Sequence, residues 1–175
     1  MKTRKQVAVA LLGIVISGCA TTIETAFVPG DSSGWKLGHG SDRRGRTIAE
    51  YVPHYESINN WSKLLTIQFL EGERSPPLAV MERLRSRIQT RCPGAFWSII
   101  RQEPSSVLYE WKISGCPGNP DQNEIARLLR GNDGVHRIAY VEKVPNMTAA
   151  ERDKWINAFS DAYVVKGGQR VVLAP

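Results

Sequence analysis

The clearest alternation of apolar and polar side chains lies over residues 63–70. Apolar residues occupy every second position from Leu65 to Phe69, and Thr66 and Gln68 fall between them. Successive side chains of a strand point to opposite faces of its sheet, so this spacing predicts a strand with one buried face. Shorter apolar stretches are expected to add strands at the edge of the domain, at 35–37 and 47–52.

Two stretches rich in aromatic and β-branched residues, 95–101 and 107–114, predict a β-hairpin. The polar segment between them contains Pro104 and is typical of a turn. Folding the chain about Pro104 sets Trp97 opposite Trp111, and the other large apolar side chains then share that face. The second face is expected to be more polar, with the pairs Phe96–Lys112 and Ser98–Glu110.

The same register predicts a disulfide. Cys92 and Cys116 each open a Cys-Pro-Gly triplet, and the hairpin places them directly opposite each other. Opposed residues of an antiparallel pair have Cβ atoms about 4.5–5.5 Å apart, which is close to disulfide reach. The alternative is a metal-binding pair, but a closed zinc site needs further Cys or His ligands that this region lacks. We therefore expect the bridge, with no metal and no other cofactor.

A helix is predicted from Pro76 and Pro77 to about residue 91, because apolar residues recur there at helical spacing. Its opposite face carries one arginine per turn, at Arg83, Arg87 and Arg91. Two interpretations of these arginines stay open. They form a solvated face whose side-chain stems cover the sheet, or a surface for lipid phosphates, lipopolysaccharide or an acidic partner protein.

A second helix is predicted over residues 148–164. Thr148 is expected to cap its start and Glu151 completes a capping box. The side chains expected to be buried follow at helical spacing: Trp155, Phe159 and Ala162.

Residues 121–144 admit two interpretations. A capping box at Asp121 would begin a helix that ends at Gly131. Alternatively, residues 124–130 and 135–144 form two strands joined by a tight turn that contains Asp-Gly, a strong hairpin signal. We favour the hairpin, because the second apolar stretch needs a partner strand.

The first nineteen residues are typical of an export signal. Three cations, Lys2, Arg4 and Lys5, precede an apolar run of about ten residues, whereas a membrane-spanning helix needs about 20. The run ends in Ile16-Ser17-Gly18-Cys19, which resembles the lipobox of bacterial lipoproteins. The alternative is an ordinary signal peptide with a chance cysteine.

The resemblance implies cleavage before Cys19, a diacylglycerol on its sulfur and usually acylation of the freed amine. Two or three acyl chains anchor a protein stably where one does not. By the sorting habit of the family, Ala20 rather than aspartate after the cysteine favours the outer membrane. We therefore expect a protein of the bacterial cell envelope, held on the outer membrane by lipid and facing the periplasm, where disulfides persist.

Composition and charge narrow the class. The chain has 175 residues, 42% of them apolar and 23% charged, which is typical of one globular domain. Its formal net charge of +6, less the three cations of the leader, leaves +3. This charge is too small to imply binding to nucleic acid.

Candidate catalytic groups are few and scattered along the sequence. His54 with Glu56 is the nearest approach to an acid–base pair, although two surface residues beside a proline are the simpler interpretation. Trp35 and Trp61 are the tryptophans that the predicted elements do not place in a core. The remaining histidines stand far from this pair, at positions 39 and 136.

Together the elements predict an α+β domain, an antiparallel sheet of about five to seven strands with two helices packed on it. The expected organisation is a signal peptide at 1–18, a lipidated flexible tether at 19–34, one domain at 35–165 and a tail or short strand at 166–175. The order of elements, with Glu56-Ser57-Ile58-Asn59-Asn60-Trp61 leading into a strand, resembles the PsbP/DcrB-like domains. The resemblance implies a fold and no activity.

The sequence thus favours a non-enzymatic lipoprotein that presents a surface to another envelope protein, as an accessory module of an envelope machine. The rival interpretation is an envelope hydrolase or a carrier of small ligands. It requires a pocket between helix and sheet, lined by His54, Glu56 or His136.

Overall fold

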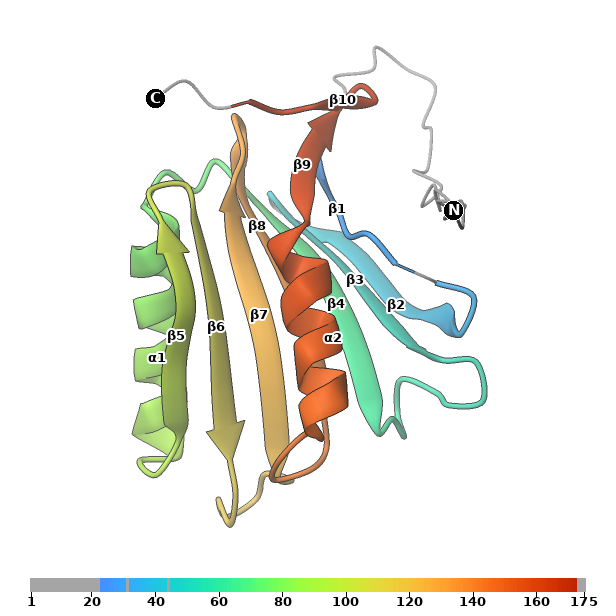
Figure 1. The fold of residues 1–175 in the computed structure, drawn as a ribbon, viewed down its shortest axis with the longest axis vertical. Coiled ribbons are helices and arrows are strands. Elements are labelled where there is room, and N and C mark those ends of the chain that lie inside the picture. Colours follow the sequence, from blue (N-terminus) through green and yellow to red (C-terminus); the bar gives the residue numbers. More distant parts are fainter. Residues whose placement is uncertain (1–22, 31, 44, 173–175) are drawn as a thin grey trace, which may run out of the picture.

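The computed structural model describes residues 23–30, 32–43 and 45–172, which form an α+β fold (Figure 1). Its main sheet has seven antiparallel strands in the order β2-β3-β4-β8-β7-β6-β5. The predicted fold class is confirmed. The strands are Trp35–Arg43 (β2), Arg46–Pro53 (β3), Lys63–Glu71 (β4), Phe96–Glu103 (β5), Ser106–Ile113 (β6), Gln122–Arg130 (β7) and Gly134–Glu142 (β8).

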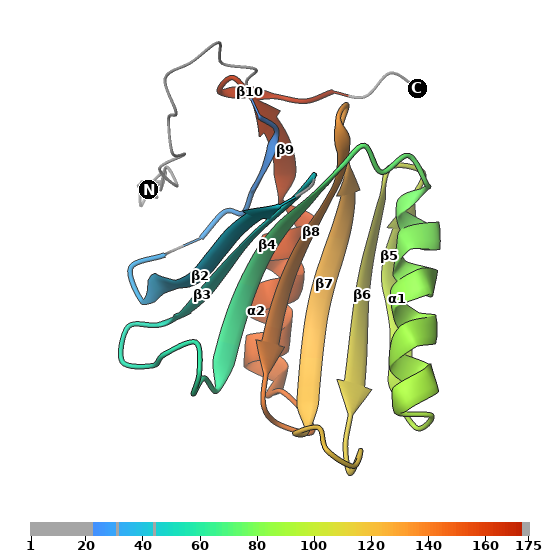
Figure 2. The ribbon, with the colours of Figure 1, turned by 180° about the vertical axis from the view of Figure 1, so that it is seen from behind.

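Two helices, α1 (Pro77–Arg91) and α2 (Ala149–Ser160), cover opposite faces of this sheet. α2 lies in front of the sheet in Figure 1, and α1 lies in front of it when the molecule is turned round in Figure 2. The central strands are therefore buried on both sides, so that the consecutive residues Leu108 and Tyr109 are 1% and 0% exposed. Each belongs to a different core, with Leu108 under α2 and Tyr109 under α1.

Both pairs predicted for the second face of the β5–β6 hairpin, Phe96–Lys112 and Ser98–Glu110, are present. This polar face is nevertheless covered, and Glu110 is only 3% exposed. The reason is that α2 returns over this face after β8. Arg152 of α2 and Asn123 of β7 each place a nitrogen within 3.0 Å of a Glu110 carboxylate oxygen.

Both predicted hairpins are present. Trp97 pairs with Trp111 and Ile99 with Tyr109, as the register predicts, and a bulge then shifts the pairing by one residue before the turn. Residues 121–144 form the β7–β8 hairpin rather than a helix and a strand.

A second sheet of three short strands, in the order β1-β9-β10, lies at one end of the molecule (Figure 1). Its strands are Thr25–Phe27 (β1), Tyr163–Lys166 (β9) and Gln169–Arg170 (β10). β1 falls within the segment predicted as a flexible tether, so the folded part of the chain begins earlier than residue 35. The segment expected as a tail or short strand contains the end of β9 and all of β10.

The second helix ends at Ser160, four residues before its predicted end. The guanidinium of Arg127 stops it there, donating to the carbonyl oxygens of Phe159 at 2.7 Å and Ser160 at 2.8 Å. The next residues then join β1 as strand β9. Ala162 is buried as predicted, but it lies between the helix and the strand.

Candidate functional site

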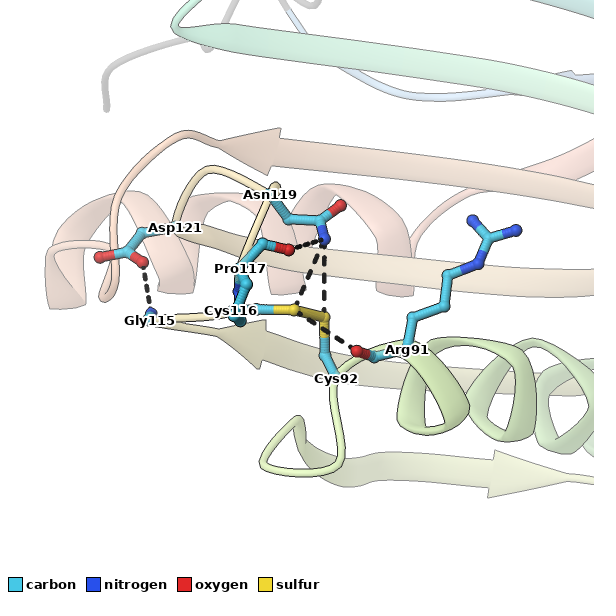
Figure 3. Close-up of a disulfide and its surroundings, with 7 residues drawn as sticks. All are labelled: Arg91, Cys92, Gly115, Cys116, Pro117, Asn119 and Asp121. Atoms are coloured by element: carbon cyan, nitrogen blue, oxygen red, sulfur yellow. Dashed lines mark hydrogen bonds between the residues drawn. A yellow bond between two sulfur atoms is a disulfide. The ribbon is translucent and has the colours of Figure 1, made fainter.

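The Cys92–Cys116 disulfide is present and joins the end of α1 to the segment after β6 (Figure 3). The two Cα atoms are 5.6 Å apart. Asn119 places its amide nitrogen 3.5 Å from the Cys116 sulfur and 3.9 Å from that of Cys92, and it donates to the Pro117 carbonyl at 3.2 Å. Both cysteines are buried. The bridge is therefore a structural brace, enclosed by its own loop.

The three predicted surface arginines of α1 are all exposed, but they do not stand alike. Arg83 places a guanidinium nitrogen 2.6 Å from the carboxylate of Glu73 and another 3.2 Å from the Ser75 hydroxyl. It thereby holds the loop between β4 and α1. Arg87 and Arg91 lie farther along the helix, toward the disulfide.

At the other end of the sheet, a buried carboxylate fixes the start of the described chain. Glu24 is 1% exposed and lies directly before β1. Its carboxylate oxygens accept the backbone N–H groups of Asn132 at 2.9 Å and Asp133 at 3.1 Å, in the β7–β8 turn. A turn with two adjacent free N–H groups is a natural seat for an anion. We call this arrangement the Glu24 clamp.

Two further residues complete the Glu24 clamp. Gly131 leaves the space that the carboxylate fills, because a Cβ atom there would meet the Glu24 Oε2 at 2.1 Å. The Nε2 of His136 lies 3.4 Å from the same oxygen. The His136 ring is fully buried and stacks on Phe69 at a centroid distance of 4.5 Å. Burial lowers the pKa of His136, and the neighbouring carboxylate of Glu24 offsets part of that effect.

The interior under α2 holds a cluster of aromatic and acidic groups. The Tyr140 hydroxyl lies 2.5 Å from Glu142 and 2.9 Å from Glu151, and the Trp155 indole N–H donates to Glu151 at 2.9 Å. Burial, followed by the two carboxylates, raises the pKa of Tyr140. Trp35 packs edge-on against Tyr140, which gives this tryptophan a place in the core. These groups bind one another and fix α2 to the sheet.

The residues of the rival interpretation do not meet. His136 lies within the Glu24 clamp, whereas His54 and Glu56 follow β3 at the opposite end of the sheet. Glu56 accepts the backbone N–H and the hydroxyl of Ser62 at 2.7 and 2.5 Å, and it lines an open hollow with its neighbours. These bonds lower the pKa of Glu56 despite a desolvation effect that would raise it. The hollow also includes Trp61, which lies under the ammonium of Lys143.

Sequence reasoning did not identify Glu24 or Arg127. Glu24 stands in a polar segment with no periodicity, and its partners lie more than one hundred residues away. Arg127 occupies a position in β7 that the alternation of the strand would assign to an apolar side chain. In the sequence, the Glu24 clamp is indicated only by the Gly-Asn-Asp-Gly turn at 131–134, because the backbone N–H groups of this turn need an acceptor.

No protein-family model, curated protein or solved structure matches the chain. The likeness to PsbP/DcrB-like domains therefore stays a prediction. Neither helix of the described residues is long and apolar enough to cross a membrane. Within residues 23–30, 32–43 and 45–172 no three His, Cys, Asp or Glu side chains are grouped as a metal site. The leader and Cys19 lie outside the described residues.

Proposed function

We propose that the chain is an envelope lipoprotein, anchored through lipid on Cys19, that acts by binding another envelope component rather than by catalysis. The observation that carries this proposal is the Ile16-Ser17-Gly18-Cys19 motif at the end of a short, basic-flanked apolar run. This combination of a basic segment, a short apolar run and small residues is typical of an export signal.

Two features of the fold support a location at the membrane of the cell envelope. The Cys92–Cys116 bridge requires an oxidising compartment, which export provides. The Glu24 clamp brings the chain into the folded body five residues after Cys19. A lipid at that cysteine would hold the domain directly at the membrane, as expected of an anchored module.

The anchor is tested by expressing the chain with its own leader in a bacterium that is fed an alkyne-labelled fatty acid. We expect label on the protein, and recovery of the protein with the outer membrane. A Cys19→Ala variant should lose both the label and the membrane association. The matched control, Cys92→Ala with Cys116→Ala, should keep the label because its leader is intact. Equal labelling of wild type and Cys19→Ala would exclude the proposed anchor.

We assign the partner surface to the outer face of α1, around Arg87 and Arg91. Arg83 is expected to contribute less, because its guanidinium already forms an ion pair with the Glu73 carboxylate. Guanidinium groups bind carboxylates in a fixed fork, so an acidic protein surface is the expected partner. Cross-linking in intact cells should give an adduct that Arg87→Gln with Arg91→Gln removes. Lys36→Gln, an exposed cation of β2, is the control. If the adduct forms equally in wild type, in the double arginine variant and in the Lys36→Gln control, the outer face of α1 is not the partner surface.

A further inference from the structure

The Glu24 clamp limits how far the folded body can stand from the proposed anchor. Five residue steps separate Cys19 from Glu24. A fully extended chain covers at most about 3.6 Å per residue, so the anchored residue lies within about 18 Å of Glu24. Strand β7 has nine residues, and at about 3.4 Å per residue it extends for about 30 Å. The disulfide end of the sheet is thus beyond the reach of the lipid, whereas the β7–β8 turn is within it.

The same end carries exposed apolar side chains. Ile23, beside the clamp, is 66% exposed, and Val172, just after β10, is 83% exposed. Single exposed apolar residues are ordinary on a protein surface. These two, however, adjoin the small β1-β9-β10 sheet, since Ile23 precedes β1 and Val172 follows β10. At a bilayer surface such side chains lose contact with water.

Arginines from two separate strands lie near this small sheet. Arg101 in β5 and Arg170 in β10 are both exposed. Arg101 pairs with Leu108 of β6, and Leu108 pairs in turn with the buried Arg127 of β7. Arg170 pairs with Val165 of β9, and Arg127 donates to the Ala162 carbonyl directly before that strand at 3.3 Å. Glu103, 3.7 Å from the Arg127 guanidinium, and Asp161 offset part of the positive charge. Gathered guanidinium groups favour phosphate, which accepts their paired N–H groups.

We infer that the β1-β9-β10 end of the molecule is seated on the phospholipid headgroups that hold the anchor, with Arg101 and Arg170 binding lipid phosphates. This orientation rests on the proposed lipidation of Cys19. It leaves the disulfide end and the exposed part of α1 directed away from the bilayer. The lipid then acts as a rigid mount for the domain, and the partner surface faces the periplasm.

The test uses the acylated protein in vesicles of phosphatidylethanolamine and phosphatidylglycerol, with amide hydrogen exchange as the measurement. We expect slower exchange over residues 131–134 and 166–170 in vesicles than in detergent, with no change over residues 114–121 at the disulfide end. A flexible Gly/Ser insert of about 20 residues after Thr21 adds a span of roughly 25 Å and should remove the protection. Slowed exchange at 114–121, or no slowing at 131–134 and 166–170, would overturn the orientation. Identical exchange with and without the insert would contradict the short tether as the rigid mount.

Two pairs of substitutions test the role of the arginines. Arg101→Gln with Arg170→Gln should lower the equilibrium constant for seating by about fivefold for each arginine at an anionic surface. Arg87→Gln with Arg91→Gln on α1 removes the same charge elsewhere and should leave the protection unchanged. Equal effects of the two pairs would contradict the assignment of Arg101 and Arg170 to lipid phosphates.

Flotation of the vesicles and the intact mass separate this inference from the proposed function. A protein that carries no acyl chain contradicts the lipoprotein itself. A protein that is acylated and floats, but shows no protection confined to the β1-β9-β10 end, contradicts only the orientation.

Discussion

At one end of the seven-stranded sheet the chain is held by the Cys92–Cys116 disulfide, and at the other end by the buried carboxylate of Glu24. The bridge joins two segments that are already neighbours through the β5–β6 hairpin. The Glu24 clamp joins the start of the described chain to a turn more than one hundred residues away, through two hydrogen bonds. Both fix a loop, but with different chemistry.

The difference matters for how each end responds to its surroundings. A disulfide is broken by a reductant and is indifferent to moderate changes of pH. A carboxylate held by backbone N–H groups depends on its charge and on the space left for it. The disulfide end is therefore expected to be the more persistent of the two, and the end beside the proposed anchor the more readily perturbed.

Removing the disulfide should have the largest effect. Because the bridge closes a loop of 25 residues from Cys92 to Cys116, Cys92→Ser with Cys116→Ser should lower the free energy of unfolding by about 3.5 kcal/mol. Urea denaturation of the variant, and of wild type with and without a reductant, measures this loss. A variant as stable as oxidised wild type would show that the hairpin alone holds this end.

A glycine-to-alanine substitution at each end of the sheet compares how tightly the two ends are packed. Gly131→Ala would place a Cβ atom 2.1 Å from the Glu24 carboxylate, and should cost about 2 kcal/mol by displacing it from the turn. Gly94→Ala, next to the disulfide, meets no atom within 4 Å and should change stability little. Thermal unfolding of both variants provides the test. Equal losses would mean that the clamp is not tightly packed.

Glu24→Gln removes the charge and keeps the size of the side chain. Hydrogen bonds to a charged acceptor are stronger than those to a neutral one, so we expect a loss of about 1 kcal/mol. Proteolysis of residues 23–30 should also become faster, because β1 is released. Glu71→Gln, at an exposed position, is the control. The clamp would be refuted by equal protease resistance in Glu24→Gln and wild type.

Mild acid should destabilise the end that holds the Glu24 clamp, and this is the smallest of the predicted effects. Burial holds the pKa of His136 below its ordinary value of 6.5, so below that pH the unfolded chain binds a proton that the folded chain resists. The stability is therefore complete above pH 6.5 and falls as the pH drops toward the lowered pKa. Glu24 and Asp133 favour the charged ring and reduce the loss.

The measurement is the free energy of unfolding between about pH 7 and pH 5.5, a window above the ordinary range of carboxylates. His136→Gln removes the titrating ring and should flatten the dependence in this window. An unchanged slope in the variant would assign the pH dependence to other groups.

The disulfide end could be predicted from the sequence because its contacts are local. The hairpin register fixes Trp97 opposite Trp111, and the same register leads outward to the two cysteines. Each element there repeats a pattern of period two or 3.6, and a neighbouring segment completes it. Thr148 likewise caps α2 as expected, since capping involves only residues of the same turn.

The clamp end could not be predicted in this way. Glu24 has no pattern around it, and its acceptor role exists only because a distant turn presents two N–H groups. The predicted end of α2 was wrong for a similar reason, because the guanidinium of Arg127 in β7 donates to the last carbonyl groups of the helix. The burial of Glu110 depends on a helix that returns over the second face of the sheet. Such contacts are long-range, and local periodicity carries no record of them.

The most direct test of the account is the intact mass of the protein isolated from bacterial membranes, followed by sequencing of its amino-terminal peptide. We predict a chain that begins at Cys19, carries two or three acyl chains and retains the Cys92–Cys116 bridge. A chain that begins at Met1 with an unmodified Cys19 sulfur would contradict the anchor, and with it the orientation inferred for the β1-β9-β10 end.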